Sequence, residues 1–159
     1  MYQAEDRTGN LVLLLQSAAE GSIAVATSVA DLEALLRQEA TRAAAQQGVK
    51  VEDVRIKLQA RSERALAVEV QVRAKKLFLS ATVCITGALE IDDQLNTRLR
   101  DLQCQGEGAL GSLACNFIAP YLQRFDGRAF ALTALPLGEV KLHDVRLAAG
   151  ADLRVTAQF

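Results

Sequence analysis

The sequence predicts an α+β fold: a long, curved antiparallel β-meander wrapped around one bent apolar helix, with a second amphipathic helix near the N-terminus. Apolar residues recur every three or four positions from Gly108 to Phe125, which indicates a helix with one apolar face. Residues 54–105 instead alternate between apolar and polar, the period of half-buried strands. Short polar turns separate these alternating segments, which favours a meander over parallel βαβ units.

Length and composition indicate one globular domain that covers residues 1–159. Half of the residues are hydrophobic and 23% are charged, which suits a chain with a sizeable core. Residues 1–9 are mainly polar, and we expect them to be flexible. The formal net charge of -1 supplies no general positive field, so a nucleic-acid partner is not expected.

The apolar run at residues 11–15 is too short for a secretory h-region or a membrane span. Its periodicity leaves open whether it is a buried strand or a helical turn. Residues 23–27 follow as a short strand. The chain as given is therefore expected to be cytoplasmic and to have no membrane span, with a cell-envelope location if a leader was removed.

The amphipathic helix near the N-terminus begins after Ser28, a favourable N-cap, and Asp31 suits its first turn. Glu33 and Arg37, spaced i to i+4, are expected together on its polar side. Gly48 is expected to end it. Its apolar stripe consists of Val29, Leu32, Leu35, Leu36, Ala40, Ala43 and Ala44.

The meander is expected to contain four strands, over residues 54–60, 66–74, 77–85 and 89–105. The fourth changes phase: Leu95 and Leu99 share one parity, whereas Leu102 and Cys104 share the other. This change predicts a β-bulge near residues 100–101. Two closing strands are expected at residues 140–147, with a second phase shift at 143–144, and at residues 153–159.

The helix predicted at Gly108–Phe125 has to bury its apolar stripe, and the sheet is the natural partner. Pro120 removes one backbone donor and is expected to bend this helix. The stripe consists of Leu110, Leu113, Ala114, Phe117, Ile118, Tyr121, Leu122 and Phe125.

The chain has three cysteines, Cys84, Cys104 and Cys115, and none belongs to a C-x-x-C pair. The odd number and the spacing favour free thiols that behave as small hydrophobic residues in a reducing compartment. One disulfide with a spare thiol is the alternative.

Residues 106–111 match G-x-G-x-x-G, the glycine pattern of dinucleotide-binding sites, and Asp126 lies downstream. The antiparallel context and the unbroken helical stripe after the motif disfavour that interpretation, and Glu107 would place a carboxylate beside the pyrophosphate. A tight turn and a close approach of helix and sheet explain the three glycines of the motif, Gly106, Gly108 and Gly111, better. No cofactor is therefore expected.

No other pattern reaches the specificity of a catalytic or metal site. His143, the only histidine, precedes Asp144, but neighbours on a strand point to opposite faces, so a surface histidine is favoured. Glu90 and Asp92 alone make a weak metal site. Ser112 lacks a nucleophile elbow. The basic side chains of the meander are interpreted as its solvated face: Arg55, Lys57, Arg61, Arg64, Arg73, Lys75 and Lys76.

Three segments carry a likeness to a known family: the strand-to-helix entry ATSVADLEALL at residues 26–36, the helix at 108–121 with Pro120, and the ending LRVTAQF at 153–159. With the order of elements over residues 22–159, the chain resembles the tubular lipid-binding (TULIP) superfamily of bactericidal/permeability-increasing protein type, especially its small single-domain bacterial members. The resemblance implies a curved sheet around a helix and an elongated apolar groove for an acyl chain or other lipid. Members are commonly exported.

Two functions from different classes follow. The first is non-enzymatic binding of an apolar ligand or lipid in a groove lined by Leu79, Val83, Leu113, Phe117 and Tyr121. The second is a structural or interaction domain with a filled core, whose exposed edge strand docks a partner such as a second copy. No enzymatic activity, catalytic residue or metal site is expected.

Overall fold

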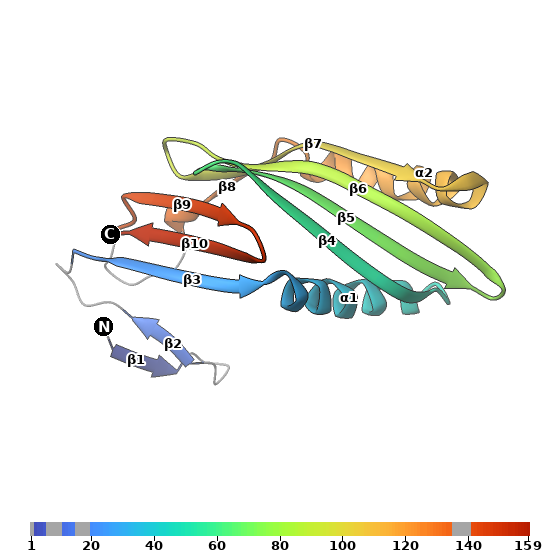
Figure 1. The fold of residues 1–159 in the computed structure, drawn as a ribbon, viewed down its shortest axis with the longest axis horizontal. Coiled ribbons are helices and arrows are strands. Elements are labelled where there is room, and N and C mark those ends of the chain that lie inside the picture. Colours follow the sequence, from blue (N-terminus) through green and yellow to red (C-terminus); the bar gives the residue numbers. More distant parts are fainter. Residues whose placement is uncertain (1, 6–10, 15–19, 135–140) are drawn as a thin grey trace.

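The computed structural model describes residues 2–5, 11–14, 20–134 and 141–159 of the chain (Figure 1). The elements are β1 (Tyr2–Glu5), β2 (Leu11–Leu14), β3 (Ser22–Ser28), α1 (Val29–Ala45), β4 (Lys50–Ser62), β5 (Ala65–Lys76), β6 (Leu79–Ile91), β7 (Asn96–Gly106), α2 (Gly108–Phe125), β8 (Ala129–Ala131), the 3-10 turn η1 (Leu132–Ala134), β9 (Asp144–Ala149) and β10 (Asp152–Gln158).

The strands form three antiparallel sheets, with the orders β1-β2, β3-β10-β9 and β4-β5-β6-β7-β8. The α+β class and the antiparallel meander are therefore confirmed. The apolar run near the N-terminus is a strand over the residues described there, 11–14. Among the described residues, no helix combines the length and hydrophobicity needed to cross a bilayer.

Cross-strand pairing divides the long sheet into an apolar and a polar face. Ile56 pairs with Val70, Val70 with Ile85, and Ile85 with Cys104. Because paired residues point to the same side of a sheet, this row marks the apolar face. The neighbouring row lies on the polar face and consists of Arg55, Gln71, Cys84 and Gln105.

Both helices lie against the apolar face, near opposite edges of the sheet (Figure 1). α1 runs along β4, and its Leu32 shares a hollow with Ile56 and Val70. α2 runs along β6 and β7 and is bonded to Cys104 of the apolar row. The sequence predicted a sheet wrapped around one helix, whereas the structure has two helices on one face of the sheet.

The apolar stripe of α2 is largely exposed, which corrects the expectation that the sheet buries it. Leu113, Phe117 and Tyr121 are 53%, 70% and 61% exposed. Gly111 and Cys115 are the buried residues of this helix. The large apolar side chains of α2 therefore contribute a surface rather than the core.

Small residues bring α2 close to the sheet. A Cβ atom added to Gly111 would lie 2.7 Å from the carbonyl carbon of Gly106 and 2.8 Å from the carbonyl oxygen of Thr82. No side chain fits between backbones at this separation. The interpretation of these glycines as a close helix–sheet approach is therefore correct for Gly106 and Gly111.

A disulfide joins Cys104 of β7 to Cys115 of α2, with 2.02 Å between the sulfur atoms and 5.5 Å between the Cα atoms. The expectation of three free thiols was wrong, and the alternative of one disulfide with a spare thiol, Cys84, is correct. The pairing arises because α2 folds back along β7, which sequence spacing alone does not reveal.

The turns of the meander differ from the predicted ones at two places. Lys76 pairs with Leu79, so Leu77 and Phe78 form the β5–β6 turn rather than the start of a strand. The predicted fourth strand is divided by a turn at residues 92–95, between β6 and β7. There the Asp92 carboxylate accepts hydrogen bonds of 2.9 Å from the backbone N–H groups of residues 94 and 96.

The predicted bulge in β7 is confirmed. The register between β6 and β7 shifts between Thr86 and Ala88, and Asp101 has a φ of 55°. Gly87 lies in β6 at this shift. A Cβ atom there would lie 2.6 Å from the end of the Leu102 side chain, so a larger residue at this position would have to displace that side chain.

The sheet β3-β10-β9 packs against the end of the meander that holds the β4–β5 turn. The backbone N–H of Leu147 in β9 donates a 2.6 Å hydrogen bond to the carbonyl oxygen of Glu63 in that turn. The buried cluster of the molecule lies at this junction and contains Leu66, Ile91, Leu95, Val145 and Leu147. Val140, which was predicted to lie in the first closing strand, is outside the described residues.

Candidate functional site: an apolar groove

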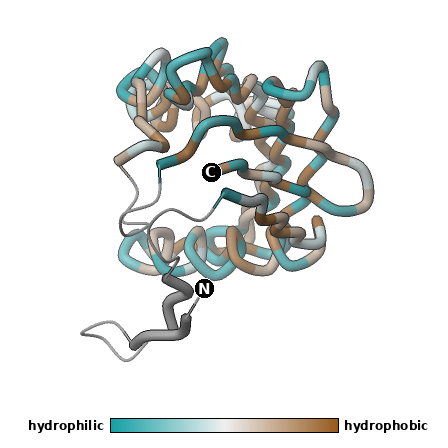
Figure 2. The backbone as a smooth tube through the Cα atoms, turned by 90° about the vertical axis from the view of Figure 1, so that its left-hand side faces the viewer, coloured by the Kyte–Doolittle hydropathy of each residue, from teal (hydrophilic) through white to brown (hydrophobic). Residues whose placement is uncertain are grey.

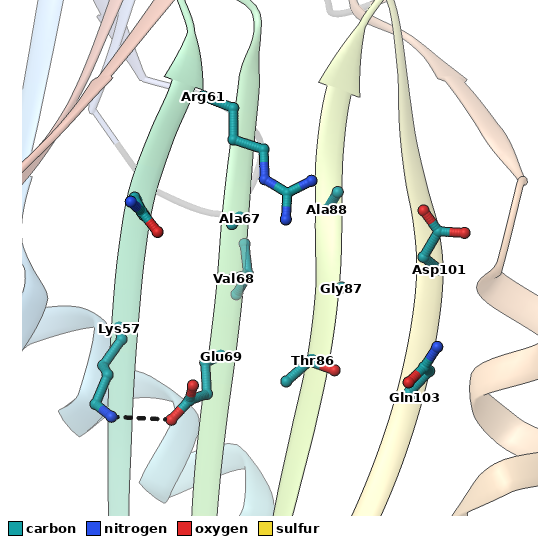
Figure 3. A pocket seen from close by; sticks show the side chains of 11 residues that line it. Lys57, Arg61, Ala67, Val68, Glu69, Thr86, Gly87, Ala88, Asp101 and Gln103 are labelled. Atoms are coloured by element: carbon teal, nitrogen blue, oxygen red, sulfur yellow. Dashed lines mark hydrogen bonds and ion pairs between the residues drawn. The ribbon is translucent and has the colours of Figure 1, made fainter.

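The polar face of the long sheet carries a hollow of about 410 Å³. Figure 3 shows the Arg61 and Asp101 side chains on either side of Ala88, and the ion pair between Lys57 and Glu69, which measures 3.1 Å. These charges have both signs and the basic side chains are exposed, as on an ordinary solvated face. This hollow is the weaker candidate.

The apolar face carries an open groove of about 420 Å³, and among the described residues that line it, Thr97 is the only polar one. Ligand sites in proteins combine this size with predominantly apolar walls. The lining comes from the long sheet (Ile56, Leu58, Leu66, Val68, Val70, Leu89, Ile91 and Thr97), from α1 (Leu32, Leu35 and Leu36), from η1 (Leu132), and from β9 and β10 (Val145, Leu147, Leu153 and Val155).

The side chains reach the groove because of the periodicities in the sequence. Val68 and Val70 are two residues apart on β5 and therefore share a face. Leu32, Leu35 and Leu36 are spaced as on one side of a helix. Hydrophilic and hydrophobic positions alternate around the turns of α1, along the lower edge of Figure 2. Leu35 is 55% exposed, so the groove opens to solvent on this side.

Polar contacts position α1 at the edge of the groove. The Ser28 hydroxyl caps the helix by accepting a 3.0 Å hydrogen bond from the backbone N–H of Asp31, as predicted. Glu33 accepts a 2.8 Å hydrogen bond from the backbone N–H of Ile56 in β4. Since this residue lies on an edge strand, the contact also satisfies an N–H that another chain would otherwise pair with.

Arg37 contributes the second polar contact between α1 and β4. Its guanidinium lies 2.8 Å from the Asp53 carboxylate, which Arg55 also approaches to 3.0 Å. The hydrogen bond from Arg55, with the positive charges of Arg55 and Arg37, holds the pKa of Asp53 below its usual value. Glu33 and Arg37, which were expected on the polar side of the helix, thus both contact β4, and Arg37 remains exposed.

An ion network fastens β9 to the turns at the end of the groove. Arg64 lies 2.6 Å from Asp144 and 2.9 Å from Asp93, and Arg146 lies 2.8 Å from Asp144. The hydrogen bonds from Arg146 and Arg64 lower the pKa of Asp144. Asp144 is therefore a structural residue, and the exposed His143 beside it takes no part in the network.

The five residues expected to line the groove lie apart from it. Leu113, Phe117 and Tyr121 form the exposed stripe of α2, Leu79 is 46% exposed beside the β5–β6 turn, and Val83 is 6% exposed. None of them belongs to the lining of the apolar groove. The leucines of α1 had been recognised as a stripe, but no feature of the sequence indicated which helix borders the hollow.

The remaining candidates acquire no catalytic geometry. The described residues contain no group of three or more His, Cys, Asp or Glu side chains that suits a metal ion. Asp126 caps the end of α2 against β7, where Gly127 donates a 2.7 Å hydrogen bond to Leu99. A scan against protein-family models and searches of the curated proteins and the solved structures found no significant match to the chain.

Proposed function

We propose that this protein binds an apolar ligand, such as the acyl chain of a lipid, in the groove between α1, the long sheet and β9–β10, without enzymatic activity. The observation that supports this function is the groove itself: about 420 Å³, open to solvent and lined by apolar side chains except at Thr97. Large apolar surfaces left open in this way mark ligand or partner sites.

The resemblance to the tubular lipid-binding superfamily is part of this proposal. It implies an elongated apolar groove beside a helix, and the groove at α1 supports that expectation, although the helix is the first one and not α2. The Cys104–Cys115 disulfide supports an oxidising compartment, such as the cell envelope, over the cytoplasm.

Native mass spectrometry of the protein purified from cells, followed by lipid extraction, tests the proposal. We expect an adduct of lipid mass and saturable binding of the fluorescent acyl chain cis-parinaric acid. Leu35→Gln should weaken this binding about 10-fold, because the probe loses an apolar contact. Leu113→Gln is the matched control, since Leu113 is equally exposed but lies on α2, outside the lining.

Two outcomes would contradict the proposal. Absence of both the adduct and probe binding would remove the ligand function. Equal losses of probe binding in Leu35→Gln and Leu113→Gln would indicate a ligand site at α2 rather than in the groove. The alternative of a filled core with a docking edge strand has less support, because the groove is open and Glu33 already bonds the β4 edge at Ile56.

A further inference from the structure

The β5–β6 turn exposes the two least buried large hydrophobic side chains of residues 20–134 and 141–159. Leu77 is 81% exposed and Phe78 is 83% exposed. They occupy a two-residue turn between paired strands, so the strands hold both residues at the tip of a hairpin. Figure 1 shows this turn at the end of the long sheet that lies away from β9 and β10.

Lysines surround this apolar tip. Lys75 and Lys76 immediately precede Leu77, and Lys50 is the cross-strand partner of Lys75. All three are exposed, and none forms an ion pair with a carboxylate in the described part of the chain. Residues 74–81 and 46–51 contain no acidic residue. The net charge of -1 therefore conceals a local positive region.

We infer that the β5–β6 turn docks this protein onto the surface of an anionic phospholipid bilayer. Leu77 and Phe78 enter the boundary between headgroups and acyl chains, while Lys50, Lys75 and Lys76 stay at the level of the phosphates. Long lysine side chains suit this arrangement because their stems tolerate apolar surroundings while the ammonium groups remain hydrated. Charge complementarity favours a membrane over a second copy of the tip, which would bring like charges together.

The inference does not depend on a lipid in the apolar groove. The groove lies on the face between α1 and β9–β10, whereas the tip is a surface feature of β5 and β6. Vesicle binding therefore measures docking, and the cis-parinaric acid assay measures the groove, so either proposal can fail while the other holds.

Flotation with vesicles of phosphatidylglycerol and phosphatidylcholine tests the docking. Leu77→Ser/Phe78→Ser should weaken binding at least about 10-fold, since both apolar side chains lose their contact with the bilayer. Lys75→Gln and Lys76→Gln should each weaken it about 5-fold. Pure phosphatidylcholine vesicles should bind weakly, and added salt should weaken the binding to anionic vesicles.

Leu113→Ser/Phe117→Ser is the matched control, because it removes the same two side-chain types from another exposed surface. It should bind anionic vesicles like the wild type. Equal losses in the two double variants, or unchanged binding of Leu77→Ser/Phe78→Ser, would overturn the inference. Absence of wild-type binding to anionic vesicles would also overturn it.

A tryptophan reporter locates the tip directly. The chain has no Trp, so Phe78→Trp introduces a single tryptophan, at the turn. Its emission should shift to the blue on addition of anionic vesicles and should be quenched by brominated acyl chains. A blue shift that appears with protein concentration in the absence of vesicles would indicate contact between copies and would contradict membrane docking.

Discussion

α1 and α2 flank the same apolar sheet face, and different chemistry fastens each helix to it. α1 has no buried residue and is held by the hydrogen bond from Ile56 to Glu33 and the ion pair of Arg37 with Asp53. α2 is held by the close approach at Gly111 and by the Cys104–Cys115 disulfide. Several large apolar side chains stay at least 40% exposed beside these attachments: Leu35 and Leu36 on α1, and Leu113, Phe117 and Tyr121 on α2. The apolar stripes are therefore left for the groove at α1 and for the surface at α2.

The largest loss of stability is expected from a substitution at Gly111, where the backbone of α2 packs closely against the backbone of the sheet. Gly111→Ala places a Cβ atom within 2.9 Å of three backbone atoms, so the helix has to move away from the sheet. We expect the free energy of unfolding to fall by about 3 kcal/mol, measured by urea denaturation.

Gly150→Ala is the control for that variant, because a Cβ atom at Gly150 meets nothing within 4 Å. Its free energy of unfolding should change by less than about 1 kcal/mol. A Gly111→Ala protein as stable as this control would show that α2 does not pack closely against β6 and β7.

Loss of the disulfide that attaches α2 to β7 should have the next largest effect on stability. Cys115→Ala removes a cross-link between residues 11 apart in sequence, which we expect to lower the free energy of unfolding by about 2–3 kcal/mol. A reducing agent should lower the stability of the wild type by a similar amount. Cys84 lies outside the disulfide, so Cys84→Ala should not change the effect of the reducing agent on stability. Equal stability in oxidising and reducing buffer would contradict the disulfide.

Much of the fold was predictable because it depends on local periodicity. The alternation in β4 and β5, the Ser28 cap and the bulge at Asp101 follow from residues close in sequence. The turn at residues 92–95 was missed because apolar residues on both sides of it continue an alternating pattern.

The site was less predictable because it depends on which distant segments meet. A helical stripe indicates that one side of a helix is apolar, but not whether the sheet, a ligand or solvent faces it. At α2, Gly111 and Cys115 contact the sheet, and Phe117 stays exposed. At α1, the contact is made by Glu33 and Arg37, which read as surface residues in the sequence.

The polar attachment of α1 should be weaker than either attachment of α2. Glu33→Ala leaves the backbone N–H of Ile56 without its acceptor, and we expect a loss of about 1.5 kcal/mol in the free energy of unfolding. Binding of cis-parinaric acid should weaken too, because α1 forms one wall of the groove. Glu39→Ala is the control on the same helix, where the exposed carboxylate pairs with the exposed Arg42 and should contribute less than about 0.5 kcal/mol. Equal effects of the two variants would mean that Glu33 does not hold the helix to β4.

The smallest expected effect is a pH dependence of the contacts that hold α1, which the contacts of α2 should not share. The pKa of Asp53 is lower in the folded chain than in the unfolded chain, so its contacts with Arg55 and Arg37 stabilise the fold above about pH 4, the pKa of an unperturbed Asp. This contribution is lost as the pH falls through the lower folded-state pKa. The difference in melting temperature between the wild type and Asp53→Asn should therefore be present at pH 7 and should close below about pH 4. Asp101→Asn is the control, because it changes an exposed carboxylate on β7, three strands away from β4 in the sheet, and should change the melting temperature little. A difference for Asp53→Asn that persists at pH 2 would mean that the carboxylate acts through its shape rather than its charge, and α1 would then be held much as α2 is, by packing.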